Sequence, residues 1–443
     1  MTRKKASFPT AVYASARGEI LDAPELAAAG RSGRAVLPLD PADLIPLPDG
    51  SELYFLPERE PLGFPGPSRI PAPLEGTAVA AFLPPSYSVS ALAAYRSRER
   101  APLLPLYTYT ALCWYRGALH VAAERVEEDV KHDPASFEDE ELEARIAALR
   151  ARHPHNRLIE HLGSNCALSY GCANAKNLFH GRWECPIPLA PACNARCVGC
   201  ISAQPDSPIP SPQERLAFVP SVDEVLEIAV AHLDSAPRAM LSFGQGCEGE
   251  PLMQGELLCE IVRAIRARSS RGTLHLNTNG SKPSVVARLA GAGLDSIRVS
   301  LNSAREGPYT CYYRPATYRF ADVVESLCVA RRARLFASIN YLSFPGFTDT
   351  EEEFAALCEL VRETGLAMIQ WRNLNIDPDA YAETVGMGEE PGFGLRELRR
   401  RLAAAFPGLR HGYVNPPRET WGGAPRASPS GERRARDEAG RSL

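Results

Sequence analysis

From about residue 183 onward the chain alternates short apolar runs with segments of helical spacing, and this alternation limits the possible folds most strongly. Strand and helix units repeated with little chain between them are typical of a parallel sheet covered by helices. Six of the apolar runs are predicted to be strands: residues 184–189, 239–243, 273–277, 296–301, 336–342 and 367–372. The pattern predicts an α/β fold, a partial (β/α)6 TIM-like barrel, whose working residues follow the strands' carboxyl ends.

Local signals place helices between these strands. Ser221 and Thr350 each begin an S/T-x-x-E sequence, which favours the start of a helix. The remaining divisions follow from texture and composition. We expect an N-terminal mixed α+β or β-rich domain over 1–125, with strands at 52–56 and 78–83 and a hairpin at 112–122. A helical, cysteine-containing connector should follow over 126–182, with an amphipathic helix at 138–152. The barrel is expected over 183–379, a C-terminal extension over 380–415 with a helix at 394–406, and a disordered tail over 416–443.

Composition excludes several classes of protein. With 45% apolar and 23% charged residues among 443, the chain is neither fibrous nor wholly disordered. The net charge of −4 gives no general attraction to nucleic acid, so we do not expect a nucleic-acid partner. The sequence has no apolar run of membrane-spanning length and its start does not resemble a signal peptide, so we expect a cytoplasmic protein without a membrane partner.

Cysteines are crowded into one part of the chain. Six of the 12 lie between Cys166 and Cys200, and Cys193, Cys197 and Cys200 form a C-x3-C-x2-C motif just after the first predicted strand. Structural zinc usually takes four ligands in two separated pairs, and the sequence has no second C-x2-C or H-x3-H pair. A [4Fe-4S] cluster also normally takes four cysteines, so three would leave one iron with an open position. An open position is typical of a metal that does chemistry.

This motif at the end of a barrel's first strand resembles the radical S-adenosylmethionine (radical SAM) superfamily. Three later segments are similar to motifs of that family, in the expected order at successive strand ends: 246–252 (GCEGEPL) resembles its Gly-Gly-Glu-Pro loop, 277–280 (NTNG) its "TNG" strand ending, and 299–302 (VSLN) the strand that meets the cofactor. The resemblance covers about residues 183–375. Two positions depart from it, since Glu248 replaces the first glycine and Gly199 stands where a bulky residue is common.

The resemblance implies a [4Fe-4S] cluster on Cys193, Cys197 and Cys200, which are then both the metal ligands and the catalytic residues. It also implies S-adenosylmethionine as the second cofactor, a 5′-deoxyadenosyl radical that abstracts hydrogen from an unidentified substrate, and a reducing partner such as flavodoxin or ferredoxin. The cofactor-binding candidates are Gly249, Glu250, Pro251, Asn277, Asn279, Ser300, Asn302 and Asn340. Each of these positions also has a plainer interpretation, as a helix-entry turn or a polar strand end.

Other cysteines have two interpretations. Cys166, Cys172 and Cys185 could ligate an auxiliary iron-sulfur cluster with Cys247, although Cys185 in a strand also fits a small buried apolar residue. Cys311, in an aromatic-rich stretch after the fourth strand, could return a hydrogen atom to a substrate radical or be an ordinary loop cysteine. For the whole chain two alternatives stay open: a non-catalytic iron-sulfur binding or sensing module, and an RNA-modifying radical SAM enzyme, against which the acidic net charge argues.

Overall fold

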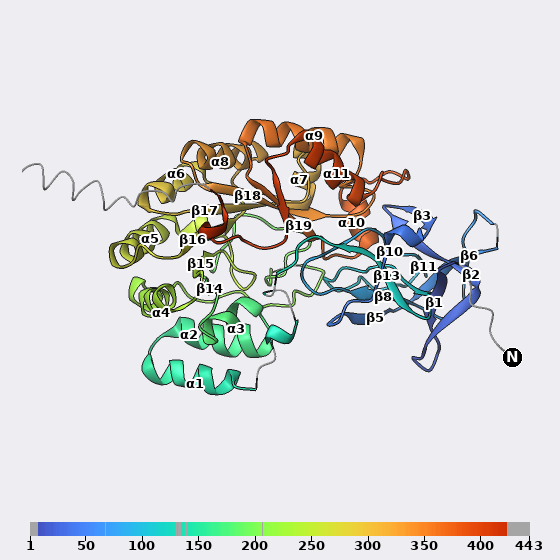
Figure 1. The fold of residues 1–443 in the computed structure, drawn as a ribbon, viewed down its shortest axis with the longest axis horizontal. Coiled ribbons are helices and arrows are strands. Elements are labelled where there is room, and N and C mark those ends of the chain that lie inside the picture. Colours follow the sequence, from blue (N-terminus) through green and yellow to red (C-terminus); the bar gives the residue numbers. More distant parts are fainter. Residues whose placement is uncertain are drawn as a thin grey trace, which may run out of the picture.

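The computed structural model describes residues 8–422, apart from 67, 130, 132–133, 138–139 and 206. Figure 1 shows an antiparallel β region at one end, a barrel with outer helices at the other, and connector helices α1 to α3 beside the barrel's first strand. No helix in this part of the chain is long and apolar enough to cross a membrane.

The first part of the chain forms a branched antiparallel sheet with the central order β11-β6-β2-β1-β12-β13-β4. Its strands are β1 (Thr10–Ala14), β2 (Ile20–Ser32), β3 (Ala35–Pro38), β4 (Leu44–Pro46), β5 (Glu52–Leu56), β6 (Arg59–Pro65), β7 (Ala72–Pro73), β8 (Thr77–Phe82), β9 (Tyr87–Val89), β10 (Leu92–Ala93), β11 (Tyr95–Ser97), β12 (Leu112–Tyr115) and β13 (Ala118–Arg125). The predicted strands and hairpin are confirmed as β5, β8 and β12–β13. Arg116 and Gly117 make the hairpin turn, with φ values of 50° and 90°.

Helix is nearly absent from this region. Within its described residues the one helical element is a short 3-10 turn at Pro41–Asp43, so the region is β-rich rather than evenly mixed.

Helices α1 (Leu142–Arg152), α2 (Arg157–Glu160) and α3 (Ala173–Phe179) follow, with a π-helix at His161–Ser169 between the last two. The predicted helix at 138–152 is confirmed from residue 142, while 138–139 lie outside the described residues. Asn156 caps α2 by accepting a hydrogen bond from Ile159 N at 3.0 Å, and its amide donates to Glu224 O at 2.8 Å. The connector is therefore fixed to the first barrel helix.

The barrel sheet is parallel throughout, in the order β14-β15-β16-β17-β18-β19-β20. Its strands are β14 (Glu184–Ile187), β15 (Met240–Phe243), β16 (Thr273–Thr278), β17 (Ser296–Leu301), β18 (Phe336–Ser343), β19 (Met368–Asn373) and β20 (Arg410–Gly412). Its helices are α4 (Val222–Ser235), α5 (Gly255–Arg268), α6 (Pro283–Ala292), α7 (Glu306–Tyr313), α8 (Phe320–Arg332), α9 (Glu351–Thr364), α10 (Pro378–Thr384) and α11 (Leu395–Ala405). All six predicted strands are confirmed, and β20 is a seventh that the sequence analysis missed.

The predicted helix starts are also present. Ser221 and Glu224 form a reciprocal capping box at α4, and Thr350 accepts a hydrogen bond from Glu353 N at the start of α9. The Glu353 side chain is not part of a box. It is buried and accepts hydrogen bonds from Ser303 and Arg305, which follow β17, and from Tyr341 of β18.

Side chains of the barrel strands divide by their two faces. Leu274, Leu276, Ile297, Val299, Ile339 and Trp371 are buried in the apolar core between sheet and helices. The intervening residues His275, Asn277, Arg298, Ser300, Ser338, Asn340, Gln370 and Arg372 share the other face, where neighbouring strands place them side by side. TIM-like barrels are usually filled with branched apolar side chains, so this polar interior leaves room for a ligand.

A buried ion pair joins the antiparallel sheet to the barrel. Arg59 of β6 contacts Asp377 at 2.9 Å, and their side chains are 3% and 1% exposed. Asp377 also accepts from Leu104 N at 2.9 Å and caps α10 through the N–H groups of Asp379 and Ala380. One carboxylate therefore ties the two sheets together just beyond β19.

We predict that Arg59→Met lowers the free energy of unfolding by about 3–5 kcal/mol, because Asp377 is left buried without its counter-charge. Arg96→Met is the matched control, since the Arg96 side chain is 60% exposed in its pair with Glu60 and should cost less than about 1 kcal/mol. Urea unfolding of both variants measures the difference. Equal losses would contradict the structural role of the Arg59–Asp377 pair.

The predicted disordered tail needs a correction at its start. Residues 416–422 pack on the barrel: Trp421 stacks on Phe336 with ring centroids 4.7 Å apart, and Arg418 N donates to Thr273 Oγ1 at 2.9 Å. The aromatic ring supplies the apolar contact that the Pro- and Gly-rich composition concealed. The rest of the tail, from residue 423, lies outside the described residues.

Candidate functional site

The three motif cysteines lie on the loop that follows β14, and the loop after β15 is packed directly against them. Gly249 N donates to Ala190 O at 2.6 Å and Glu250 N donates to Ala192 O at 2.9 Å. A Cβ atom on Gly249 would lie 2.1 Å from Ala192 O and 3.0 Å from Cys193 N. Glycine is required here because the two backbones touch.

Glu248, which departs from the family motif, fixes the start of the same loop. Its carboxylate is buried and accepts hydrogen bonds from Leu189 N at 2.6 Å, Ala190 N at 2.8 Å and Gln245 N at 2.8 Å. Burial raises the pKa of Glu248 to about 8, and the three N–H donors oppose that shift. Glu248 thus anchors the backbone of this loop at the position where the family motif has its first glycine.

Glu250 joins the β15 loop to the β16 loop. Its carboxylate accepts from Asn279 N at 2.8 Å, Leu252 N at 3.0 Å and the Thr278 hydroxyl. Burial raises the pKa of Glu250 to about 7. The Asn279 amide in turn donates to Asn194 Oδ1 at 2.9 Å, next to Cys193. Three predicted motifs therefore meet in one hydrogen-bonded network around the cysteine loop.

Helix α7 contacts the cysteine loop on its other side. Arg196 N donates to Tyr313 O and Val198 N to Tyr312 O, both at 3.0 Å. The Tyr312 hydroxyl would lie 2.8 Å from a Cβ on Gly199. The side-chain volume that the family often places before its third cysteine is therefore filled here by Tyr312. Cys311, on the same helix, is exposed.

The thiols of the motif share a partly buried environment. Burial, and then the nearby Glu250, raise the pKa of Cys193 to about 11. The pKa of Cys197 is raised by burial and by Cys200 and Cys193, while burial also raises that of Cys200. Thiolates in such a place need a cation, and three cysteines on one short loop are a donor set that fits an iron-sulfur cluster with one iron left open.

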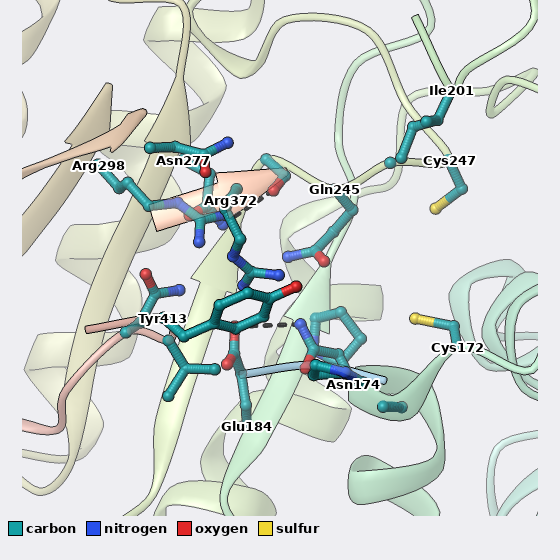
Figure 2. A pocket seen from close by; sticks show the side chains of 18 of the residues that line it. Cys172, Asn174, Glu184, Ile201, Gln245, Cys247, Asn277, Arg298, Arg372 and Tyr413 are labelled. Atoms are coloured by element: carbon teal, nitrogen blue, oxygen red, sulfur yellow. Dashed lines mark hydrogen bonds between the residues drawn. The ribbon is translucent and has the colours of Figure 1, made fainter. Parts of the chain in front are cut away.

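A cavity of about 520 Å³ lies beside this loop, inside the barrel and partly covered by the antiparallel sheet. Gly199 and Ile201 border it from the cysteine loop, and Phe82 and Thr108 border it from the antiparallel sheet. Figure 2 shows Asn277, Arg298 and Arg372 from the strands together with Gln245, Cys172 and Cys247 around the same space. Its size suits a small-molecule ligand.

Some of the predicted cofactor-binding residues line the cavity, and the others make hydrogen bonds within the protein. Asn277 and Asn340 line the cavity. Gly249, Glu250 and Asn279 hold loops together, as described above. Ser300 accepts from Asn340 Nδ2 at 3.5 Å, one layer behind the wall. Asn302 is fully buried and donates to Pro308 O and Tyr381 Oη, both at 3.2 Å.

The four cysteines postulated to bind an auxiliary cluster also differ in whether they line the cavity. Cys166, Cys172 and Cys247 line the cavity. Cys185 is 0% exposed within β14 and does not, because its side chain belongs to the apolar face. This placement favours the alternative interpretation of Cys185 as a small buried apolar residue.

Two arginines lie inside the barrel, and sequence reasoning missed one of them, Arg298. Arg298 donates to Gln370 Oε1 at 2.8 Å, while its Nε and that of Arg372 are buried without a hydrogen-bond partner. Burial and the neighbouring Arg372 lower the pKa of Arg298 to about 9. A cation within the alternating strand sequence SIRVSL was the signal that could have identified Arg298.

His275 is a buried neutral member of the polar interior. Its Nε2 lies 2.9 Å from Asn277 Oδ1, and its Nδ1 lies 2.7 Å from Ser296 Oγ. The Asn277 amide donates to the carbonyls of Phe243 and Gly244, so Asn277 Oδ1 is the acceptor and the proton sits on Nε2. Burial, followed by the charge of Arg298, lowers the pKa of His275 to about 3.

This lowered pKa predicts acid sensitivity. The unfolded chain takes up the proton below the ordinary value of 6.5, so the stability due to His275 is present above that pH and lost as pH falls. Between pH 7 and pH 5 the loss should be about 2 kcal/mol. We expect His275→Gln to remove that part of the pH dependence in urea unfolding at the two pH values. An unchanged difference between pH 7 and pH 5 would contradict this.

Residues 187–358 match the family model of the radical SAM superfamily. No curated protein matches the chain. Among solved structures, it is similar to methylornithine synthase (12% identity, TM-score 0.37, covering 64% of this chain and 75% of that chain). It is also similar to spore photoproduct lyase with bound AdoMet (14%, 0.37, 54% and 85%) and to Streptococcus suis SuiB with its precursor peptide SuiA (14%, 0.36, 65% and 67%).

The structural likenesses are too distant to carry an argument about substrate. The family match runs from the end of β14 into α9 and includes the cysteine loop, the Glu250 loop and the carboxyl ends of β14 to β18. Members of this family use a [4Fe-4S] cluster and S-adenosylmethionine. Residues 187–358 of the chain therefore carry a radical SAM domain.

Proposed function

We propose that this protein is an enzyme that reductively cleaves S-adenosylmethionine at a [4Fe-4S] cluster held by Cys193, Cys197 and Cys200. The observation that carries the proposal is that the loop bearing these three thiols is hydrogen-bonded to the Gly249–Glu250 backbone beside a cavity. When bound, the reduced cluster and the sulfonium cofactor supply a 5′-deoxyadenosyl radical that removes a hydrogen atom from a substrate.

The chain's own residues would bind and orient. The carboxylate of Glu250 accepts hydrogen bonds from the Thr278 hydroxyl and from the N–H groups of Leu252 and Asn279. Its part is therefore to hold the loop, which leaves backbone groups of the β15 loop for the cofactor's methionine portion. Asn277 and Asn340 offer polar atoms to the cavity, and Asn340 Oδ1 is buried without a partner. The cover made by Phe82 and Thr108 would exclude water from the radical.

The test is electron paramagnetic resonance of the anaerobically reconstituted and reduced full chain, with and without S-adenosylmethionine. A [4Fe-4S]+ signal that changes on addition of the cofactor, with release of 5′-deoxyadenosine, is the expected result. A cluster signal that the cofactor leaves unchanged would favour the non-catalytic iron-sulfur module. Absence of any cluster would overturn the proposal.

Charge in the cavity indicates the kind of substrate. Arg298 and Arg372 project into it with unpartnered Nε atoms, and Glu184 is the carboxylate lining the described wall. Arg298 also donates to Gln370, and Arg372 lies 4.0 Å from the centroid of the Tyr413 ring, but a buried Nε–H without a hydrogen-bond partner is costly, and a carboxylate or phosphate would satisfy it. We infer that the substrate carries an anionic group that binds between these arginines.

Succinate serves as a probe for that inference. At ten times its dissociation constant it should stabilise the folded chain by about 1.4 kcal/mol, and Arg298→Met should abolish the effect. Arg332→Met, at a position 62% exposed, should leave it intact. Thermal unfolding with and without succinate makes the comparison. A shift that survives in Arg298→Met would overturn the assignment.

A further inference from the structure

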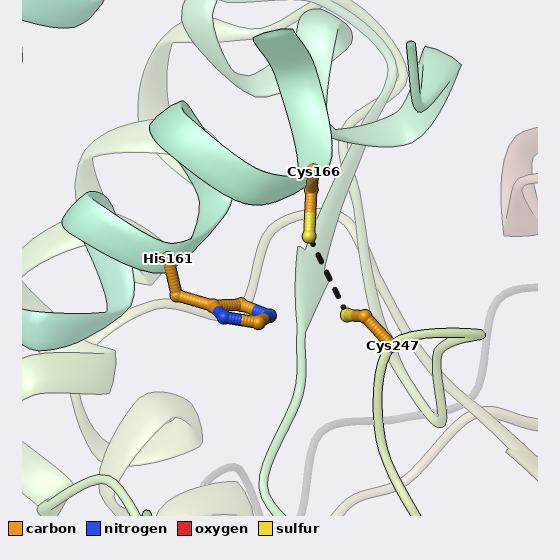
Figure 3. Close-up of side chains that lie close together, drawn as sticks. All are labelled: His161, Cys166 and Cys247. Atoms are coloured by element: carbon orange, nitrogen blue, oxygen red, sulfur yellow. Dashed lines mark hydrogen bonds between the residues drawn. The ribbon is translucent and has the colours of Figure 1, made fainter. Parts of the chain in front are cut away.

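A second group of metal-ligating side chains lies outside the cysteine motif. His161, Cys166 and Cys247 are all buried, and their donor atoms lie within 4.8 Å of one another. The two sulfurs are 3.5 Å apart. Figure 3 shows the His161 ring edge directed at the space between them. None of the three belongs to the C-x3-C-x2-C motif, so the barrel cluster does not require them.

The local backbone explains why His161 and Cys166 meet. They are five residues apart, which in an α-helix would turn them roughly 140° away from each other. The segment His161–Ser169 is a π-helix, whose hydrogen bonds join residues five apart and so stack such residues on one side. π-Helical turns are uncommon and concentrate at functional sites. Cys247 completes the group from the loop after β15.

His161 is prepared to donate a lone pair. Its Nε2 is buried without a hydrogen-bond partner, and the imidazole is 7% exposed. Its Nδ1 lies 3.3 Å from Asn165 Nδ2, and the two ends of an amide can exchange places by a flip. With the Asn165 oxygen turned to this position, Nδ1–H donates and Nε2 faces the sulfurs as a free acceptor. An outer hydrogen bond of this kind commonly orients a metal-bound histidine.

The spacing distinguishes one ion from a cluster. Two sulfurs on one tetrahedral zinc, each at about 2.3 Å, lie roughly 3.8 Å apart, close to the 3.5 Å between Cys166 and Cys247. Cysteines of a [4Fe-4S] cluster each bind a different iron and are spread more widely. In the described part of the chain, Cys193, Cys197 and Cys200 do not form a group within 4.8 Å.

We propose that His161, Cys166 and Cys247 bind a single zinc-class divalent ion whose fourth position faces the cavity. Cys166 and Cys247 line that cavity, so water or a donor atom of the substrate can complete the coordination. Binding transfers no electron and releases two thiol protons to solvent, and the two thiolates then neutralise the ion. The proposal is independent of the cluster, because the two sites share no ligand.

Cys172 provides the matched control. It lines the same cavity, and Figure 2 shows its sulfur and that of Cys247 both directed toward that cavity. It is the nearby cysteine that the three-ligand arrangement leaves out. Cys172→Ser should therefore keep the ion, whereas Cys166→Ser combined with Cys247→Ser should lose it.

The experiment is metal counting on the full chain, purified anaerobically from medium containing iron and zinc. About one zinc and about four iron per chain are expected in the wild type. The Cys166/Cys247 double variant should lose the zinc and keep the iron. About eight iron per chain without zinc, with half of it lost in the double variant, would mean an auxiliary cluster and overturn the single-ion site. Loss of zinc in Cys172→Ser as well would overturn the open position.

Cobalt gives a readout that does not depend on folding of the double variant. In the full chain with Cys193, Cys197 and Cys200 all changed to Ala, one equivalent of Co²⁺ should produce tetrahedral visible bands and thiolate charge-transfer absorption, which Zn²⁺ displaces. His161→Gln should weaken these bands. No bands, together with a Cys166–Cys247 disulfide in thiol counting, would overturn the proposal. If the wild-type chain holds no barrel cluster but the variant gives the expected cobalt spectrum, the result would count against the proposed function alone.

Discussion

Cys197→Ala should abolish both the [4Fe-4S]+ signal and the release of 5′-deoxyadenosine. Cys197 is the middle ligand of the motif, and the backbone N–H of the next residue is bonded to α7, so the loop cannot shift to offer another donor. With two thiols left, the proposed cluster lacks the ligands to assemble. The effect is a loss of activity to the level of the protein-free blank.

The measurement pairs iron and sulfide content with product release under dithionite. Cys259→Ala is the control, because Cys259 is buried in α5 among apolar residues and is not a ligand of either proposed site. It should keep cluster and product formation. Cluster retention in Cys197→Ala would contradict the assignment of ligands.

Gly249→Ala should lower the rate of cofactor cleavage by about 100-fold or more, since a shift of about 1 Å in a reacting group is enough for such a loss. The added methyl group would meet backbone atoms, Ala192 O at 2.1 Å and Ala192 C at 2.4 Å, which cannot rotate away. Either the cysteine loop or the Glu250 loop must move.

Gly291→Ala tests the same chemical change where there is space. Gly291 lies inside α6 with no atom within 4 Å of the added Cβ, so the substitution should leave cleavage unchanged and stabilise the helix by up to about 1 kcal/mol. Single-turnover release of 5′-deoxyadenosine compares the two variants. A Gly249→Ala rate within a factor of about two of wild type would show that the loops do not need this contact.

Much of the fold could be predicted because the signals were local. The barrel strands are apolar runs, and Ser221 and Thr350 mark helix starts that the structure contains. Strand β20 escaped prediction because it has three residues with little apolar character, and only pairing with β19 makes it a strand. The π-helix also has no recognised sequence signal, since its hydrogen bonds depend on packing against neighbouring elements.

The site residues could be predicted where a motif is recognisable along the chain, but not where contacts between residues far apart in the sequence position them. The three cysteines and the loops around Glu250 and Asn279 are recognisable along the chain. That Tyr312 fills the space at Gly199 could not be predicted, because most of the barrel separates the two residues along the chain. The same holds for His161, whose approach to Cys247 depends on tertiary packing.

The division of each barrel strand into an apolar face and a polar face has a consequence for protein engineering. Residues that contact the outer helices carry the folding energy, whereas the alternate residues face the cavity and are linked in cross-strand pairs such as Arg298 with Gln370. Substrate preference could therefore be redesigned in libraries confined to every second position without disturbing the core. Such libraries should vary hydrogen-bonded neighbours together, because changing one member alone leaves the other unsatisfied.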